Sequence, residues 1–351
     1  MPTHVAFAPG LAACGWGIVY RENSSDHKAV YMHEFDDGFD PSFLCALGDA
    51  VGEDGVLMAE PMRDHTTFKI GGPADVVILP SDRDGLVRAL DICFMGGLLT
   101  QVIGNGSDLL VSDRGLRGAV VLLRESYSQI TVEGECVRAQ AGALLRDVAL
   151  QAADAGLSGM EPLWGIPATV GGACFMNAGA YDGCTADVLE SVEVYIPGTL
   201  GEDGCRERGR VMEVEVADLA MGYRKSRIHD QGWIVLGATF KLTPDDPDLI
   251  RRSMDDFQAR REEKQPLDMP SAGSTFKRPE GYFAGKLIMD AGLRGYTVGG
   301  AQVSEKHCGF VVNAGGATAA DVRELIAHVQ EEVKSQFGVE LEPEVRMLGD
   351  F

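Results

Sequence analysis

The stretch GIPATVGGACFMNAGAYDG, residues 165–183, decides the fold because its glycines and alanines leave a long piece of backbone uncovered by side chains. Glycine lets a backbone approach a ligand closely, and unpaired amides donate to anionic oxygens. We therefore expect this run to lie against a flat or phosphorylated ligand. The alternative is a purely structural loop, since turns also require glycine.

A shorter glycine motif, GNGSD at residues 104–108, directly follows an apolar strand pattern. A turn of small residues at a strand end can cradle a diphosphate. The third glycine of the GxGxxG dinucleotide fingerprint is absent, which argues against a Rossmann NAD site. Taken alone, the motif is also the sequence of an ordinary turn.

The periodicity of apolar residues around these motifs predicts a mixed α/β fold. A helix is expected from Pro41 to near Gly52, and a β-α-β unit follows it. The expected strands are 74–79, 100–103, 120–123, 191–196, 210–216 and 233–242, with a hairpin at 130–139 and helices at 84–94 and 144–155.

Two helix starts mark the last part of the chain. Asp246 and Pro247 have the residue types of an N-cap and a first helical position, and Thr318 with Asp321 forms a capping-box pattern. We place a domain boundary before residue 247. The predicted segments are 1–38, an N-terminal extension of unknown role, then 39–118, 119–246 and 247–351.

Composition limits the classes of partner. The 351 residues suffice for two or three domains, and the net charge of −22 disfavours nucleic acid and anionic lipid surfaces. No apolar run is long enough to span a bilayer, and eight scattered cysteines without a CxxC pair suit a reducing compartment. The histidines show no metal-binding spacing, so we expect no metal. A cytoplasmic protein is predicted.

Three segments carry side chains suited to the reduction of an activated alkene. Ser274 in SAGSTFKRP offers a hydroxyl proton, Arg224 in MGYRKS a fixed cation, and Glu344 in EPEVR a carboxylate. Serine after glycine is also ordinary turn chemistry. Basic residues gather in the same segments, as Arg224, Lys225 and Arg227 and as Lys264, Lys277 and Arg278. They could hold a small anion or form a solvated surface.

Seven blocks in the same order resemble the UDP-N-acetylenolpyruvoylglucosamine reductase (MurB) family over about residues 40 to 349. The short spacing between Arg224 and Ser274 is similar to the shorter, type II subclass. The blocks are HTTFKIGGPADV (65–76), GNGSDLLVSD (104–113), the 165–183 run, GYRKS (222–226), SAGSTFKRP (271–279), VGGAQVSEKHCGFVVNAGGATAADV (298–322) and LEPEVRMLG (341–349).

The resemblance implies a two-part FAD-binding region of the vanillyl-alcohol-oxidase (PCMH) type over 39–118 and 119–246, followed by an α/β substrate-binding domain over 247–351. NADPH would reduce the flavin at the site later used by the substrate. The implied FAD-binding residues are Gly104, Asn105, Gly106, Ser107, Gly165, Ile166, Pro167, Gly171, Gly172, Asn177, Gly179 and Ala180.

The implied reaction is reduction of UDP-N-acetylglucosamine enolpyruvate to UDP-N-acetylmuramate for peptidoglycan synthesis. Ser274 would protonate C2 of the substrate, Arg224 would stabilise the enolate, and Glu344 would lie beside it, either protonated or sharing a hydrogen bond. The implied substrate-binding residues are Tyr223, Lys264, Lys277 and Arg278. We expect a monomer that binds neither nucleic acid nor membrane.

Two other readings stay open. The first is an FAD-dependent oxidase or dehydrogenase of an alcohol or hydroxy acid on the same fold. The second is a flavin-binding protein without catalysis, against which the presence of Arg224, Ser274 and Glu344 counts.

Overall fold

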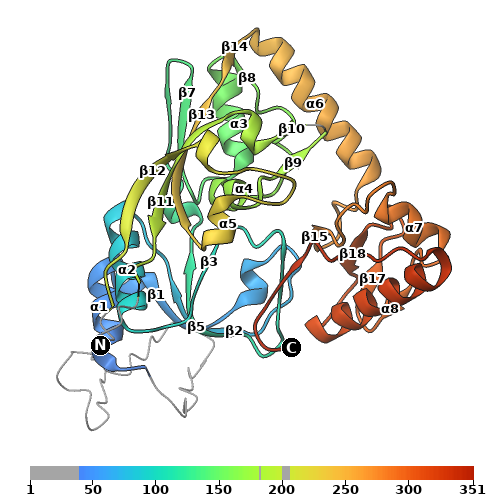
Figure 1. Ribbon diagram of the computed structural model, residues 1–351, viewed down its shortest axis with the longest axis horizontal. Helices are drawn as coiled ribbons and strands as arrows, with labels where there is room; N and C mark the ends of the chain where they lie inside the picture. The colour runs from blue at the N-terminus through green and yellow to red at the C-terminus, as the bar shows by residue number, and fades with distance from the viewer. Residues whose placement is uncertain (1–38, 182, 200–205) are drawn as a thin grey trace, which may run out of the picture.

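The structure, a computed structural model, describes residues 39–181, 183–199 and 206–351. The predicted extension at 1–38 lies outside these ranges. Figure 1 shows two sheets in the left and central parts of the molecule, with a third sheet and helices α7 and α8 set apart at the right. The predicted mixed α/β class is confirmed.

The first sheet has the strand order β1-β2-β5-β3 and mixes an antiparallel β1–β2 pair with parallel pairs of β5 to β2 and to β3. The Asp40 side chain caps α1 and Pro41 occupies its first turn, so the helix begins as the sequence predicts. The elements are α1 (Pro41–Val51), η1 (Glu53–Gly55), β1 (Val56–Pro61), η2 (Met62–His65), β2 (Pro73–Ile78), α2 (Arg83–Met95), β3 (Thr100–Ile103) and β5 (Leu116–Leu122).

The second sheet has the order β12-β11-β13-β7-β6 and is antiparallel throughout. The predicted hairpin at 130–139 is confirmed as β6 and β7. The elements of this part are η3 (Glu125–Tyr127), β6 (Ile130–Glu133), β7 (Cys136–Gln140), α3 (Leu145–Asp154), β8 (Leu157–Ser158), α4 (Val170–Met176), β9 (Gly179–Ala180), β10 (Gly183–Cys184), η4 (Thr185–Asp187), β11 (Leu189–Ile196), β12 (Arg210–Glu215), η5 (Val216–Asp218), α5 (Arg227–Gln231), β13 (Ile234–Lys241) and β14 (Thr243–Pro244).

The third sheet, β15-β18-β17-β16, packs with α8, whose apolar stripe is buried. Thr318 and Asp321 form the predicted capping box at the start of α8. The elements are α6 (Pro247–Lys264), β15 (Ser271–Ser274), α7 (Ala284–Asp290), β16 (Thr297–Val298), β17 (Ala301–Val303), β18 (Phe310–Asn313) and α8 (Ala319–Phe337). In the described part of the chain, no helix is long and apolar enough to cross a membrane.

Helix α6 connects the second sheet to the third. Its buried residues Ile250 and Met254 belong to the same hydrophobic cluster as strands β11 and β13, and the Trp164 indole N–H donates to the Met254 carbonyl at 3.0 Å. In Figure 1 the helix runs from β14 towards α7. The domain boundaries at residues 118/119 and 246/247 stay predictions, because α6 packs on the segment that precedes it.

The end of the chain returns to the first sheet's region. Strand β19 (Arg346–Leu348) pairs in parallel with β4 (Leu109–Val111), and the Ser112 amide donates to the Leu348 carbonyl at 2.9 Å. Asp113 then accepts from the Ala319 amide at 2.8 Å at the start of α8. The first unit, residues 39–118, and the third unit, residues 247–351, are therefore joined by backbone pairing as well as by the contact of Asp113 with the start of α8.

Two glycines with similar backbone conformation give a test of this packing. Gly115 has φ +80° and a Cβ there would lie 1.7 Å from the Pro73 carbonyl oxygen, whereas Gly134 has φ +62° and no neighbour within 4 Å. We expect Gly134→Ala to cost about 1–2 kcal/mol from left-handed strain alone. Gly115→Ala should cost more than about 4 kcal/mol because β2 and β5 must separate. Urea unfolding of both variants measures the difference, and equal losses would contradict it.

Candidate active site

A cavity of about 1640 Å³ lies where the three sheets approach one another. Its wall includes the turn after β3, the start of the glycine-rich run, the end of α6, strand β15 and the residues just before β19. Pockets for drug-sized ligands occupy roughly 300–1,000 Å³. This cavity therefore has room for a large cofactor and a substrate together.

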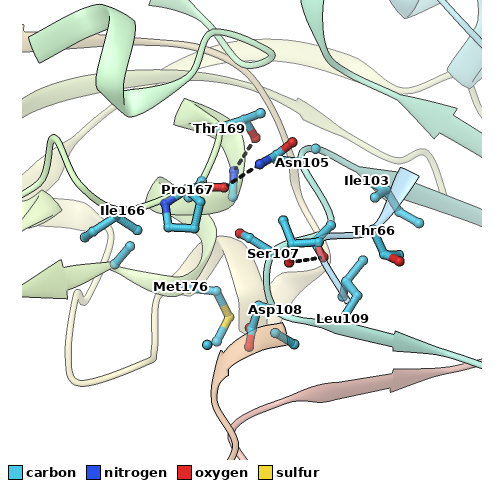
Figure 2. A pocket seen from close by; sticks show the side chains of 18 of the residues that line it. Thr66, Ile103, Asn105, Ser107, Asp108, Leu109, Ile166, Pro167, Thr169 and Met176 are labelled. Carbon is cyan, nitrogen blue, oxygen red and sulfur yellow. Dashed lines mark hydrogen bonds between the residues drawn. The ribbon is translucent and has the colours of Figure 1, made fainter. Parts of the chain in front are cut away.

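The turn at residues 104–107 approaches the glycine-rich run closely (Figure 2). A Cβ at Gly104 would lie 2.0 Å from the Thr169 hydroxyl oxygen, and one at Gly106 would lie 2.4 Å from the His65 carbonyl oxygen. The Asn105 side-chain amide donates to the Pro167 carbonyl at 2.7 Å. Among the described residues, the backbone amides of 105–107 have no acceptor. These amides are available to an anionic ligand.

The glycine-rich run is not uncovered backbone throughout, because it contains helix α4. Thr169 caps this helix, and the amides of Val170 and Gly171 already donate to carbonyls of residues 143 and 141. The predicted cofactor-binding residues that line the cavity are Gly104, Asn105, Gly106, Ser107, Gly165, Ile166, Pro167, Gly171, Gly172, Gly179 and Ala180.

Asn177 is the one predicted cofactor-binding residue that is absent from the lining. It ends α4 in the left-handed conformation and is buried. Its side chain donates to the Gly222 carbonyl at 3.0 Å and accepts from the Ala186 amide at 3.0 Å. Asn177 therefore holds the turn that carries Arg224.

Arg224, Ser274 and Glu344 all line the cavity, although they come from distant parts of the chain. The Arg224 Nε donates to Glu344 Oε1 at 2.5 Å. Burial lowers the pKa of Arg224, but the Glu344 carboxylate more than offsets this and the pKa lies above its ordinary value. Arg224 has φ +52°, an uncommon conformation for a residue with a side chain, and backbone strain of this kind clusters at functional sites.

Thr275 fixes Glu344 next to Ser274. Its carbonyl accepts from the Glu344 amide at 2.8 Å, its own amide donates to the Gly309 carbonyl at 2.9 Å, and its hydroxyl accepts from the Val311 amide at 2.9 Å. The serine and the carboxylate are therefore held by one buried residue, Thr275, which directly follows β15 and is bonded to β18. Figure 1 shows β15 and β18 facing the rest of the molecule.

Two cavity residues, Asp108 and Arg346, were not assigned a role by the sequence analysis. Both line the cavity, and the Arg346 amide donates to the Asp108 carbonyl at 2.9 Å. Burial and then the charge of Glu344 raise the pKa of Asp108 to about 7, against the opposing effects of Arg346 and Arg224. Both residues lie inside quoted motifs, but their proximity depends on the β19–β4 pairing, which has no local sequence signal.

Arg261 on α6 was also missed. The residue is 8% exposed and lines the cavity, and its Nε has no hydrogen-bond partner in the described part of the chain. A Cβ at Gly165 would lie 3.2 Å from this Nε, so the glycine makes room for the guanidinium. Burial lowers the pKa of Arg261. An apolar stripe in α6 predicts the helix but does not identify a buried cation beside it.

The four predicted substrate-binding residues lie outside the cavity lining. Lys264 is exposed at the end of α6, and Lys277 pairs with Glu342 at 2.5 Å. Arg278 lies over the Phe283 ring, and its amide donates to the Tyr223 hydroxyl at 3.4 Å. Tyr223 is 61% exposed and stacks under Arg224. Tyr223 and Arg278, with the adjacent Lys277, therefore lie together next to Arg224.

Two family models match parts of this chain. A family model described as UDP-N-acetylenolpyruvoylglucosamine reductase, C-terminal domain, matches residues 265–348, and one described as FAD binding domain matches residues 74–199. A UDP-N-acetylenolpyruvoylglucosamine reductase of Agathobacter rectalis is 50% identical over 322 residues, covering 88% of this chain and 99% of that protein. The chain belongs to the UDP-N-acetylenolpyruvoylglucosamine reductase family.

Other relatives agree with this assignment. A reductase of the family from Clostridium perfringens is 47% identical over 307 residues, covering 88% of this chain and 97% of that protein. The crystal structure of the family member from Thermus caldophilus has a TM-score of 0.69 at 37% identity, covering 84% of this chain and 98% of that one. The family resemblance expected from the seven sequence blocks is confirmed.

The raised pKa of Asp108 predicts a stability difference that depends on pH. Ionised Asp108 is disfavoured in the folded state, so its penalty is absent below about pH 4, grows up to about pH 7 and is complete above it. Asp108→Asn removes the penalty. We expect this variant to be more stable than the parent by about 1–3 kcal/mol at pH 8, allowing for partial solvent screening, and by much less at pH 5.

Urea unfolding at pH 5 and pH 8, at matched ligand content, measures this difference. A variant less stable than the parent at pH 8 would mean that the two arginines outweigh burial and favour the ionised form of Asp108.

Proposed function

We propose that the chain catalyses the NADPH-dependent, FAD-mediated reduction of UDP-N-acetylglucosamine enolpyruvate to UDP-N-acetylmuramate, a step in peptidoglycan precursor synthesis. The observation that carries the proposal is the meeting of Arg224, Ser274 and Glu344 on one cavity wall in a member of this family. Each supplies a group that the reaction needs.

The residues present fit FAD. The turn at 104–107 offers free amides, Gly104 and Gly106 permit its close approach to its neighbours, and Arg261 presents a guanidinium whose Nε has no partner among the described residues. We propose that this turn, together with residues 165–167, 171–172 and 179–180, holds the cofactor largely through backbone atoms. When bound, the flavin supplies the chemistry of accepting a hydride from NADPH and passing it to the substrate alkene.

Arg224 provides permanent positive charge where negative charge develops on the substrate. Its Nε is engaged by Glu344, so the remaining guanidinium nitrogens are the groups available to the enolpyruvyl carboxylate and the enolate oxygen. Two unit charges about 4 Å apart interact by about 4 kcal/mol in a partly buried site. Such a contribution counts most in the transition state, because the charge on C2 appears only then.

Ser274 is the proposed proton donor to C2. It is solvent-accessible, follows a left-handed Gly273 and makes no side-chain hydrogen bond to a described residue, so its hydroxyl is available to a ligand. A serine hydroxyl is a weak acid and can act only if it is held close to a strongly basic enolate. The fixed backbone of Thr275 supports this positioning.

Glu344 serves as a fixed acceptor that orients the Arg224 guanidinium. The salt bridge joins side chains that are 21% and 11% exposed, so solvent screening is weak and the geometry is well defined. Glu342, by contrast, is exposed and pairs with Lys277.

The substrate's diphosphate is proposed to meet cations at the edge of the cavity. Lys264, Lys277, Arg278 and Tyr223 stay the candidates, since a strongly acidic chain must bind a dianion through a local basic group. The same acidity supports a protein that acts alone on small molecules, and we propose a cytoplasmic monomer without nucleic-acid or membrane partners.

The first test is anaerobic. Purified protein whose flavin has been reduced by NADPH should be reoxidised rapidly by UDP-N-acetylglucosamine enolpyruvate, with UDP-N-acetylmuramate as the product. The absorbance of oxidised flavin follows the reaction. A flavin that stays reduced until oxygen enters would reject the reductase function and favour an oxidase or dehydrogenase of the same fold.

Ser274→Ala should separate the two half-reactions. Reduction of the flavin by NADPH needs no proton from Ser274 and should be unchanged, which makes it the internal control. Reoxidation by the enolpyruvyl substrate should slow by about 100-fold or more, as expected when a positioned acid is removed. Rapid-mixing absorbance measures both rates. Equal rates in the parent and the variant would remove Ser274 from the mechanism and revive the reading of a serine in an ordinary turn.

A further inference from the structure

Four charged side chains meet at the same part of the cavity wall. Arg224, Glu344, Asp108 and Arg346 all line it, and Asp108 interacts electrostatically with each of the other three. Figure 2 shows Asp108 among the lining side chains, and the residue directly precedes β4. Arg224, Glu344 and Ser274 have proposed chemical roles, whereas the carboxyl group of Asp108 has none.

The backbone fixes this cluster. Arg346 begins β19, and its amide donates to the Asp108 carbonyl. Glu344, two residues before Arg346 in the chain, donates its amide to the Thr275 carbonyl. Arg224 is held by its turn, in which the Gly222 amide donates to the Lys225 carbonyl at 2.9 Å. None of the four groups can therefore move far from the others without breaking main-chain pairing.

The two carboxyl groups are not equivalent. Glu344 accepts a short hydrogen bond from Arg224, whereas the Asp108 side chain makes no hydrogen bond to any residue of the described ranges. Arg346, the cation that lowers the pKa of Asp108 most, lies over the Phe175 ring with its guanidinium carbon 4.8 Å from the ring centroid. Asp108 is thus the carboxyl group without a dedicated partner.

When both acids are ionised, as above pH 7, the charge of the cluster is balanced before any ligand arrives. Two guanidinium groups match two carboxylates, so an incoming carboxylate would leave one uncompensated negative charge in a partly buried site. Such a charge is unfavourable unless one of the acids becomes neutral.

We propose that Asp108 takes up one proton from solvent when the enolpyruvyl carboxylate binds, so that the substrate occupies a site with neutral Asp108. This inference rests on the proposed function, because it assumes that the anionic ligand is that carboxylate. Asp108 acts as a positioning residue that keeps the charge of the site matched to the substrate, and it donates no proton to C2.

The electrostatics of the free site agree with this role. With its pKa at about 7, Asp108 is half-protonated at neutral pH, and neutralising it there costs little. A bound carboxylate raises that pKa further. By linkage, substrate affinity is then independent of pH below about 7 and falls by up to about tenfold per pH unit above it, until the pKa of the complex is passed.

The experiment uses the oxidised, flavin-loaded protein without NADPH, so the substrate binds but does not react. Dissociation constants for UDP-N-acetylglucosamine enolpyruvate are measured by calorimetry from pH 6 to 8.5. Repeating each titration in two buffers of different ionisation enthalpy gives the number of protons taken up. For the parent we expect uptake of nearly one proton at pH 8 and an affinity loss of about fivefold between pH 7 and pH 8, as a pKa of about 7 requires.

Asp108→Asn fixes the neutral form without changing the size of the side chain. We expect it to bind the substrate without proton uptake and with the same affinity across the pH range. Asp255→Asn, which removes an exposed carboxylate from α6 outside the cavity, is the matched control and should behave as the parent does. UDP-N-acetylglucosamine, which lacks the carboxylate, should bind the parent without proton uptake.

Several outcomes would overturn the proposal. If the parent takes up no proton, the idea fails whether or not the asparagine variant folds. If Asp108→Asn keeps the uptake, the proton goes to another group, such as Glu344 or His65, which lines the cavity but is bonded to Glu60 at 2.8 Å. Uptake with the ligand that lacks a carboxylate would also reject it. A parent protein that binds no enolpyruvyl substrate at any pH would reject the proposed function itself.

Discussion

The active site depends on the parallel pairing of β19 with β4. Through it, the end of the chain lies beside the glycine turn that follows β3, and the carboxylate and guanidinium of the last motif enter a cavity whose other walls were built far earlier in the sequence. Main-chain hydrogen bonds fix this arrangement more strictly than side-chain contacts could, because register along a strand is set in steps of a whole residue. Glu344 and Arg346 point to the site only in this register.

A second constraint acts on the cation. Arg224 occupies a left-handed turn, and the conformation costs free energy that must be offset by its surroundings. Three contacts offset this cost. Asn177 donates to the Gly222 carbonyl, the Gly222 amide donates to the Lys225 carbonyl, and Glu344 accepts from the Arg224 guanidinium. The strained residue is thus held by contacts from α4 and from the end of the chain. Site geometry and local stability are coupled at this point.

Much of the fold follows from local patterns, whereas the site follows only in part. The caps at Asp40, Asp246 and Thr318, the hairpin at 130–139 and the strand pattern were predictable because each depends on residues close together in the chain. The family blocks placed Arg224, Ser274 and Glu344 in one site by resemblance. Asp108, Arg346 and Arg261 were missed because their burial arises from contacts between distant segments. Asn177 was included among the cofactor-binding residues because it lies in the matching motif. The motif does not show which way a side chain points, and in the structure that of Asn177 binds the Gly222 carbonyl and the Ala186 amide.

Helix α6 and strand β19 also determine what can be cut from this protein. The third unit is attached to the rest at both of its ends, by a helix whose Ile250 and Met254 are buried in the neighbouring core and by a strand paired outside the unit. A fragment containing only the third unit would expose the apolar face of α6 and an unpaired strand, and both features promote aggregation. The three sheets are therefore not separable modules. Moving the third unit into another protein would also require the partners of its two attachments, α6 and β19.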